Sequence, residues 1–144
     1  MQTEELNAVV RYLESNCLKI VTAESCTAGL IASTLAERRP ADDLARLDKM
    51  LRHAQIIVTA RDNQKLVGIS RAVTDYSYCC YLSDLAVDAG YQRQGIGKRL
   101  VKKTHAAAGE NTTLVLVAAP AAESYYPKIG MMHLASCWAI PRRS

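Results

Sequence analysis

Apolar residues recur with helical spacing at the start of the chain. Positions i, i+3, i+4 and i+7 are taken by Leu6, Val9, Val10 and Leu13. This spacing predicts an amphipathic helix over residues 3–15. The apolar run over residues 18–23 then predicts a strand, and a further helix follows until Pro40, which cannot continue it.

The middle of the chain changes from helical spacing to strand-like runs. A helix opened by Asp42 or Asp43 has an apolar face formed by Leu44, Leu47, Met50, Leu51 and Ala54. Strands are predicted over 55–60 and 65–73, and their linker, Arg-Asp-Asn-Gln, has the chemistry of a hairpin turn. A third strand is predicted over 78–87.

The last third alternates helix and strand. Residues 95–108 carry one apolar stripe and predict a helix, and the apolar run over 113–119 predicts a central strand. A short helix over 124–128 and a last strand after Gly130 complete the order. Consecutive strands followed by alternation predict an α/β (α+β) fold: one domain over residues 1–144, with a mixed, mostly antiparallel sheet flanked by helices.

Composition narrows the class of protein. Hydrophobic residues make up 49% of the chain and charged residues 22%, as in a globular protein with a core. No apolar run approaches the roughly 20 residues that span a bilayer, and the acidic start is unlike a signal peptide, so we expect a cytoplasmic protein without a membrane partner. Five cysteines without metal-ligand spacing predict reduced thiols and no metal site, and the net charge of +4 accompanies no nucleic-acid motif.

One loop has the chemistry of an anion site. It follows the strand that ends at Val87 and runs into the helix that begins near Gly95. A helix start presents free backbone N–H groups and partial positive charge, and Gly95 and Gly97 let an anion approach the backbone. Neither a dinucleotide fingerprint nor a P-loop is present, because the spacing of both motifs fails here.

The loop matches the pattern Q/R-x-x-G-x-G/A as Gln92-x-x-Gly95-x-Gly97, preceded by Leu85-Ala86-Val87 in a strand. This closely resembles the acetyl-coenzyme A signature of the GNAT N-acetyltransferases, and the resemblance covers roughly residues 40–140. It implies transfer of an acetyl group from acetyl-coenzyme A to an amine, with no metal. The cofactor-binding residues that it implies are Leu85, Ala86, Val87, Gln92, Arg93, Gln94, Gly95, Ile96, Gly97 and Lys98.

The resemblance also implies the groups that move protons. A late Tyr-x-x-x-Gly-Phe segment of the family is matched from Tyr126 to Met131, which makes Tyr126 the first candidate for the acid and Tyr125 the second. Asp84, inside the signature strand, is the candidate base, and a hydrogen-bonded structural role is the alternative. An acceptor pocket is expected to be lined by Tyr76, Tyr78 and Tyr81.

The sequence departs from the family pattern at two places. Ala119 stands where many members have an asparagine after the fifth strand, and Met131 replaces the usual phenylalanine. The 14 residues after Gly130 leave little room for the two closing strands that the family normally has. Two alternatives follow: the last strand is truncated, or a partner chain completes the sheet edge in a homodimer. The partner expected as substrate is a peptide or small-molecule amine.

A second resemblance lies near the N-terminus. The stretch Ala23-Glu24-Ser25-Cys26-Thr27-Ala28-Gly29 is similar to the A-E-S-C-T-G-G motif of the nicotinamide-nucleotide amidases associated with competence-damage proteins. Only about the first 37 residues match, so we interpret this atypical segment as the source of the first strand and helix of the acetyltransferase. A remnant amidase with Ser25 as nucleophile and a non-catalytic module that binds acetyl-coenzyme A are the two alternatives.

Overall fold

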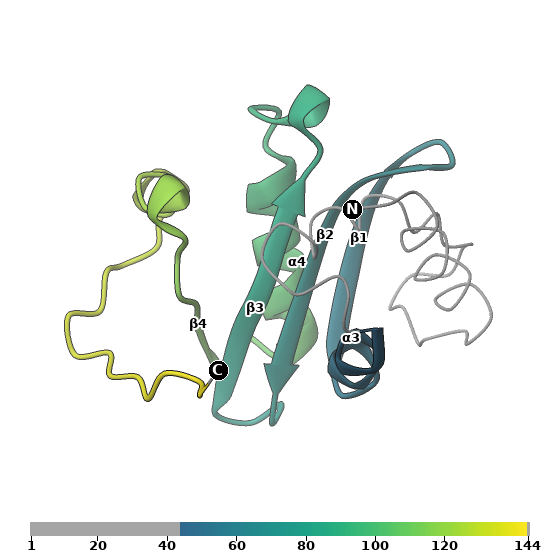
Figure 1. The fold of residues 1–144 in the computed structure, drawn as a ribbon. Helices are drawn as coiled ribbons and strands as arrows, with labels where there is room; N and C mark the ends of the chain where they lie inside the picture. The colour runs from purple at the N-terminus through teal and green to yellow at the C-terminus, as the bar shows by residue number, and fades with distance from the viewer. Residues whose placement is uncertain (1–43, 144) are drawn as a thin grey trace.

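The computed structural model describes residues 44–143, which contain a four-stranded sheet with α4 across one face (Figure 1). The order of elements is α3 (Leu44–Arg52), β1 (Ile56–Asp62), β2 (Lys65–Thr74), β3 (Cys79–Val87), η1 (Ala89–Tyr91), α4 (Ile96–Ala108), β4 (Thr113–Val115), η2 (Pro120–Ala122) and η3 (Pro127–Ile129). The mixed α+β fold is confirmed. The helix over 3–15, the strand over 18–23 and the amidase-like motif with Ser25 lie outside the described residues.

Antiparallel pairing connects the first three strands, and one parallel pairing adds the fourth. The sheet order is β1-β2-β3-β4, and β4 runs parallel to β3 after the crossover through α4. The predicted hairpin turn is confirmed: Asp62 pairs with Lys65 across Asn63-Gln64, and Asn63 takes a left-handed backbone with φ of 52°. Asparagine tolerates this conformation because its short polar side chain bonds locally.

The core lies between α4 and the sheet. Ile56 and Val58 of β1 are buried with Cys80 and Leu82 of β3 against Leu100 of α4. Gly68 of β2 lets the helix approach, since a Cβ there would lie 3.0 Å from Leu100 Cδ1. Inside this layer the Ser70 and Thr104 hydroxyls share a hydrogen bond of 2.7 Å, so neither polar group is buried unpaired.

A β-bulge changes which residues of β3 face α4. Arg71 pairs with Asp84 and the next residue of β2 pairs with Leu82, so Ser83 has no opposite residue. Before the bulge, Cys80 and Leu82 join the core, and after it Leu85 and Val87 pack against the same core. A bulge turns a strand by one residue, and here it sends Asp84 to the face away from α4.

The structure corrects three boundaries in the last third. The strand predicted over 113–119 is only Thr113–Val115, because its pairing with β3 stops at Tyr81 opposite Val115. The helix predicted over 124–128 is absent: residues 124–126 form turns, and the 3-10 turn η3 begins only at Pro127, which lacks the N–H that a helix continuing through it would need. The prediction of a strand after Gly130 is wrong, because residues 131–143 have no regular secondary structure.

Candidate functional site

The signature loop is built by the end of β3, η1 and the start of α4. Asp88 caps η1 by accepting the Gly90 N–H at 2.9 Å, and its own N–H donates to the Val67 carbonyl at 2.9 Å. Gln92 folds back, and its Nε2 donates to the Val87 carbonyl at 3.1 Å. These bonds fix the loop to the end of β3, so the start of α4 has a defined position relative to that strand.

The backbone of the loop leaves its donors free. Among the described residues, no acceptor lies within hydrogen-bond reach of the backbone N–H groups of residues 93–98. Two residues turn the chain here with left-handed backbones, Arg93 with φ of 62° and Gly95 with φ of 77°. Six free backbone donors at the start of a 13-residue helix are able to bind an anion, because the helix dipole adds partial positive charge.

One side chain of the loop is buried, and others, two of them cations, are exposed. Ile96 is buried in the core, whereas Arg93, Gln94 and Lys98 are exposed. The amide of Gln94 reaches the Gly90 carbonyl at 3.5 Å. Ile96 therefore holds the loop on the sheet, while the two cations add positive charge around the free N–H groups.

The end of β3 offers an unpaired backbone edge beside this loop. On the β4 side, β3 is paired only from Cys79 to Tyr81 within the described residues. The Asp88 N–H points to β2, so by the alternation of an antiparallel ladder the N–H groups of Leu85 and Val87 point to the other side, with Ala86 between them pointing to β2. An extended ligand lying there can bond to Leu85 and Val87 as an added strand does.

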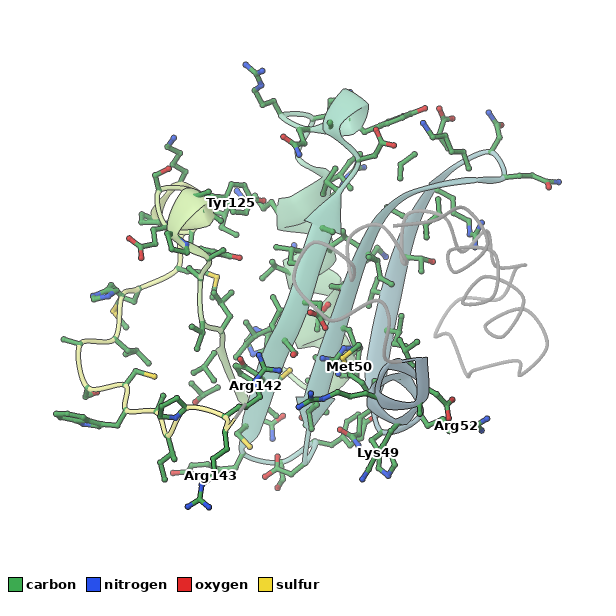
Figure 2. All side chains as sticks on the ribbon, viewed as in Figure 1. Lys49, Met50, Arg52, Tyr125, Arg142 and Arg143 are labelled. Atoms are coloured by element: carbon green, nitrogen blue, oxygen red, sulfur yellow. The ribbon has the colours of Figure 1, made fainter. Side chains whose placement is uncertain are left out.

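Tyr125 and Tyr126 lie in the segment between η2 and η3. Their ring centroids are 5.4 Å apart with an edge-on angle of 72°. Figure 2 shows Tyr125 reaching toward the start of α4. Burial, followed by the neighbouring Tyr126, raises the pKa of Tyr125 above 10.0, so its hydroxyl keeps its proton at neutral pH.

Asp84 is buried and forms an ion pair with Arg71. Arg71 Nε donates to Asp84 Oδ2 at 2.5 Å, and Arg71 Nη2 donates to the Ser83 hydroxyl at 2.6 Å. Both charged side chains are less than a tenth exposed. The bulge is what allows one guanidinium to reach two consecutive residues of β3. Arg71 was not among the site residues predicted from the sequence. The apolar pattern of β3, which shifts by one residue at the bulge, is the signal that could have indicated the bulge and its buried partner.

The three tyrosines expected in an acceptor pocket lie in β3 or in the turn before it. Tyr76 and Tyr78 lie in the turn that precedes β3, at the opposite end of this strand from the signature loop. Eight residue steps of about 3.4 Å separate the ends of β3, or about 27 Å. The Tyr76 hydroxyl donates to the Gln55 carbonyl at 3.0 Å. Only Tyr81, half-exposed on β3, lies between the turn and the loop.

Four side chains connect the β1–β2 hairpin to the signature loop. None of them was predicted from the sequence to have this role. The Tyr91 hydroxyl donates to Asp62 Oδ2 at 2.8 Å, Lys65 Nζ lies 4.8 Å from the centre of the Tyr91 ring, and Lys65 is 3.4 Å from Asp88. The hydrogen bond to Asp62 is the main reason that the pKa of Tyr91 is raised. We name Asp62, Lys65, Asp88 and Tyr91 the loop latch.

The described part of the chain contains no group of three or more His, Cys, Asp or Glu side chains placed to hold a metal ion. Two of the histidines contact backbone carbonyls, His53 that of Lys49 and His105 that of Thr112, each at 2.7 Å. Over the same residues, no helix is both long and apolar enough to cross a bilayer.

Solved structures of acetyltransferases have folds similar to this one. A GNAT-family acetyltransferase structure from Streptococcus pneumoniae is similar to 69% of this chain and 79% of its own, with 28% identity and a TM-score of 0.60. The structure of AAC(6')-Iy in complex with a CoA-containing bisubstrate analog has the same fold, with 14% identity and a TM-score of 0.61 over 81% of this chain and 88% of that one.

Curated relatives match over shorter segments. The histone acetyltransferase TAP1 of Glycine max is 31% identical over 77 residues, which are 46% of this chain and 32% of that protein. The chain thus spans about a third of the length of this plant relative. The model of the acetyltransferase (GNAT) family matches residues 17–131, most of the sequence. The chain therefore belongs to the GNAT acetyltransferase family.

Proposed function

We propose that this chain is an N-acetyltransferase that transfers the acetyl group of acetyl-coenzyme A to a primary amine by direct attack. The observation that carries the proposal is the row of free N–H donors over residues 93–98 beside the unpaired edge of β3. The first feature suits a diphosphate and the second suits an extended amide-containing chain, and coenzyme A contains both in sequence.

In this proposal the protein aligns the donor and stabilises charge. The loop from Gln92 to Lys98 holds the diphosphate through the free N–H groups of residues 93–98, since the Gln92 N–H donates to the Ala89 carbonyl. The backbone of Leu85, Ala86 and Val87 aligns the pantetheine arm. The N–H of Val87 or Leu85 then donates to the thioester carbonyl oxygen, which becomes negative as the amine attacks. A carbon–nitrogen bond forms, the carbon–sulfur bond breaks, and the leaving thiolate needs a proton.

Tyr126 is the proposed acid for the thiolate, and Asp84 the proposed base for the amine. A phenol with a pKa of about 10 can protonate a thiolate whose conjugate acid lies near 8.5 when both are held close together. For Asp84, the bond from Arg71 means that proton transfer runs through water or requires this ion pair to open. The same ion pair supports the alternative, in which Asp84 is a structural residue of the bulge.

The acceptor is proposed only as a class, a primary amine on a small molecule or peptide. The names of similar proteins support this range, because they include a histone acetyltransferase and an aminoglycoside acetyltransferase in complex with sisomicin. Of the three tyrosines expected in the pocket, Tyr81 has the most suitable position, and Tyr76 and Tyr78 would contact only a long acceptor.

A homodimer is part of the proposal. The last strand of the described sheet, β4, has three residues and no neighbour on its outer side among the described residues. The segment 131–143 beside it exposes Trp138 and Ile140 almost completely. A second copy that covers this edge would satisfy the free backbone groups and bury both side chains.

Release of free thiol from acetyl-coenzyme A over a panel of primary amines tests the function. We expect turnover with at least one amine, and a loss of about 10²-fold or more in kcat for Tyr126→Phe with coenzyme A affinity retained. Binding without turnover over the whole panel would favour the non-catalytic module. No affinity of the wild-type protein for coenzyme A would overturn the assignment.

A further inference from the structure

The two glycines of the signature are required for different reasons. At Gly95 the backbone has φ of 77° and a Cβ would meet nothing within 4 Å, so only the conformation demands glycine. At Gly97 a Cβ would lie 2.5 Å from the Tyr125 hydroxyl oxygen and 3.2 Å from its Cζ. The space beside Gly97 is therefore filled by the end of the Tyr125 side chain.

This contact joins two parts of the chain that flank the open edge of β3. Tyr125 belongs to the segment that follows β4, and Gly97 lies in the first turn of α4. The side chain of Tyr125 crosses between them, as Figure 2 shows. Its hydroxyl thus lies at the start of α4, next to the free N–H groups of the loop.

The Tyr125 hydroxyl and the backbone of the signature loop have one feature in common. In the part of the chain that the structure describes, the Tyr125 hydroxyl has no hydrogen-bond partner, and neither do the N–H groups of residues 93–98. All of these groups are donors, because the raised pKa of Tyr125 keeps its phenol protonated. Donors that lie close together without an acceptor suit an anion, which can accept from several of them.

We propose that Tyr125 is a cofactor-binding residue whose hydroxyl donates a hydrogen bond to the diphosphate of coenzyme A at the start of α4. This inference rests on the proposed function and adds a side-chain donor to a site otherwise made of backbone. It gives the adjacent tyrosines separate tasks: Tyr125 binds the diphosphate, and Tyr126 protonates the thiolate.

Matched substitutions separate the two tasks. Calorimetric titration with coenzyme A is expected to give about tenfold weaker binding for Tyr125→Phe, because a hydrogen bond to a charged group is lost. For Tyr126→Phe, the same chemical change one residue away, the affinity should stay within about twofold of the wild-type value. Turnover should show the reverse pattern, with the larger loss of kcat in Tyr126→Phe.

Ligand fragments locate the contact. The weaker binding of Tyr125→Phe should persist with dephospho-coenzyme A, which retains the diphosphate. It should disappear with pantetheine, which has none, when binding is followed by NMR titration. An equal loss with pantetheine would place the hydroxyl on the pantetheine arm and overturn the proposal.

A double-mutant cycle tests the role of Gly97. Gly97→Ala should displace the Tyr125 hydroxyl and weaken coenzyme A binding, whereas adding it to Tyr125→Phe should cost little more. Circular dichroism confirms that each variant is folded. Wild-type affinity in a folded Tyr125→Phe variant would overturn the inference and leave the proposed function standing, while absence of coenzyme A binding by the wild type would overturn the function itself.

Discussion

At the scale of single residues, the side chain of Arg71 stabilises the bulge of β3. Its guanidinium is buried and bonds both Ser83, the bulged residue, and Asp84, the residue after it. A buried ion pair adds little net stability over an apolar pair, but removing one partner leaves a charge without compensation. The pair therefore fixes the bulge more than it stabilises the whole domain.

Replacing one partner of this pair should cost far more than replacing both. We expect Arg71→Met to lower the free energy of unfolding by about 3–5 kcal/mol, because the Asp84 carboxylate stays buried and loses its charged partner Arg71. The double variant Arg71→Met/Asp84→Leu should recover most of that loss. Urea denaturation measures both, and equal losses in the single and double variants would contradict this account of the pair.

Gly95 allows a test of backbone conformation without a steric contribution. Alanine there has open space but must adopt a left-handed backbone, so Gly95→Ala should destabilise by about 1–2 kcal/mol. Asparagine tolerates this conformation and caps helices well, and Gly95→Asn should lose clearly less. Denaturation midpoints of the two variants check the prediction. An alanine variant as stable as the asparagine variant would argue against a conformational role.

At the scale of elements, the turn between β2 and β3 depends on one carboxylate. Asp75 Oδ1 accepts the backbone N–H groups of Ser77, Tyr78 and Cys79 at 2.8–3.0 Å. These bonds, the one from Tyr78 foremost, lower the pKa of Asp75 from 3.8 to about 2. The lowered pKa means that the charged carboxylate stabilises the folded hairpin.

The stability of this hairpin should depend on pH in a defined window. The contribution of Asp75 is complete above pH 3.8 and is lost as the pH falls through about 2. Between these values the difference in unfolding free energy between wild type and Asp75→Ala should shrink. Urea titrations at a series of pH values measure this, and Asp75→Asn, which keeps an acceptor oxygen without the charge, is the control.

The loop latch holds the signature loop against the β1–β2 hairpin. Tyr91→Phe removes the hydrogen bond to Asp62 but keeps the ring beneath Lys65. We expect faster hydrogen exchange of the hydrogen-bonded amides of residues 90–92 in this variant, because the loop opens more often. The exchange of β1 and β2 should stay unchanged. Uniform acceleration over the whole sheet would mean that Tyr91 stabilises the domain rather than the loop.

At the scale of the whole molecule, the sheet edge at β4 is the surface proposed to bind a second copy. Trp138 is the single tryptophan of the chain and is almost fully exposed. If a second copy covers this edge, the fluorescence emission of Trp138 should move to shorter wavelength as the protein concentration rises. Light scattering should then give the mass of a dimer. A monomeric mass with unchanged emission over the same concentrations would contradict the dimer proposal.

Local patterns were enough to predict most of the elements. The helical spacing before Arg52, the hairpin at Asn63 and the signature loop at Gly95 each depend on residues close together in the sequence. The short β4 and the absence of a strand after Gly130 were not predicted, because strand formation depends on a neighbouring edge and not on apolar character alone. The roles of Tyr126 and Asp84, and the single domain over residues 1–144, stay predictions.

The sequence by itself determined the family and the loop chemistry, because the glycines, the preceding strand and the following helix form one continuous local motif. Only the tertiary structure decided which distant side chains surround that motif. It placed Arg71 on Asp84, Asp62 on Tyr91 and the Tyr125 hydroxyl against Gly97. These contacts arise from sheet register, a bulge and the path of the chain after β4, and each depends on segments that meet only once the chain has folded.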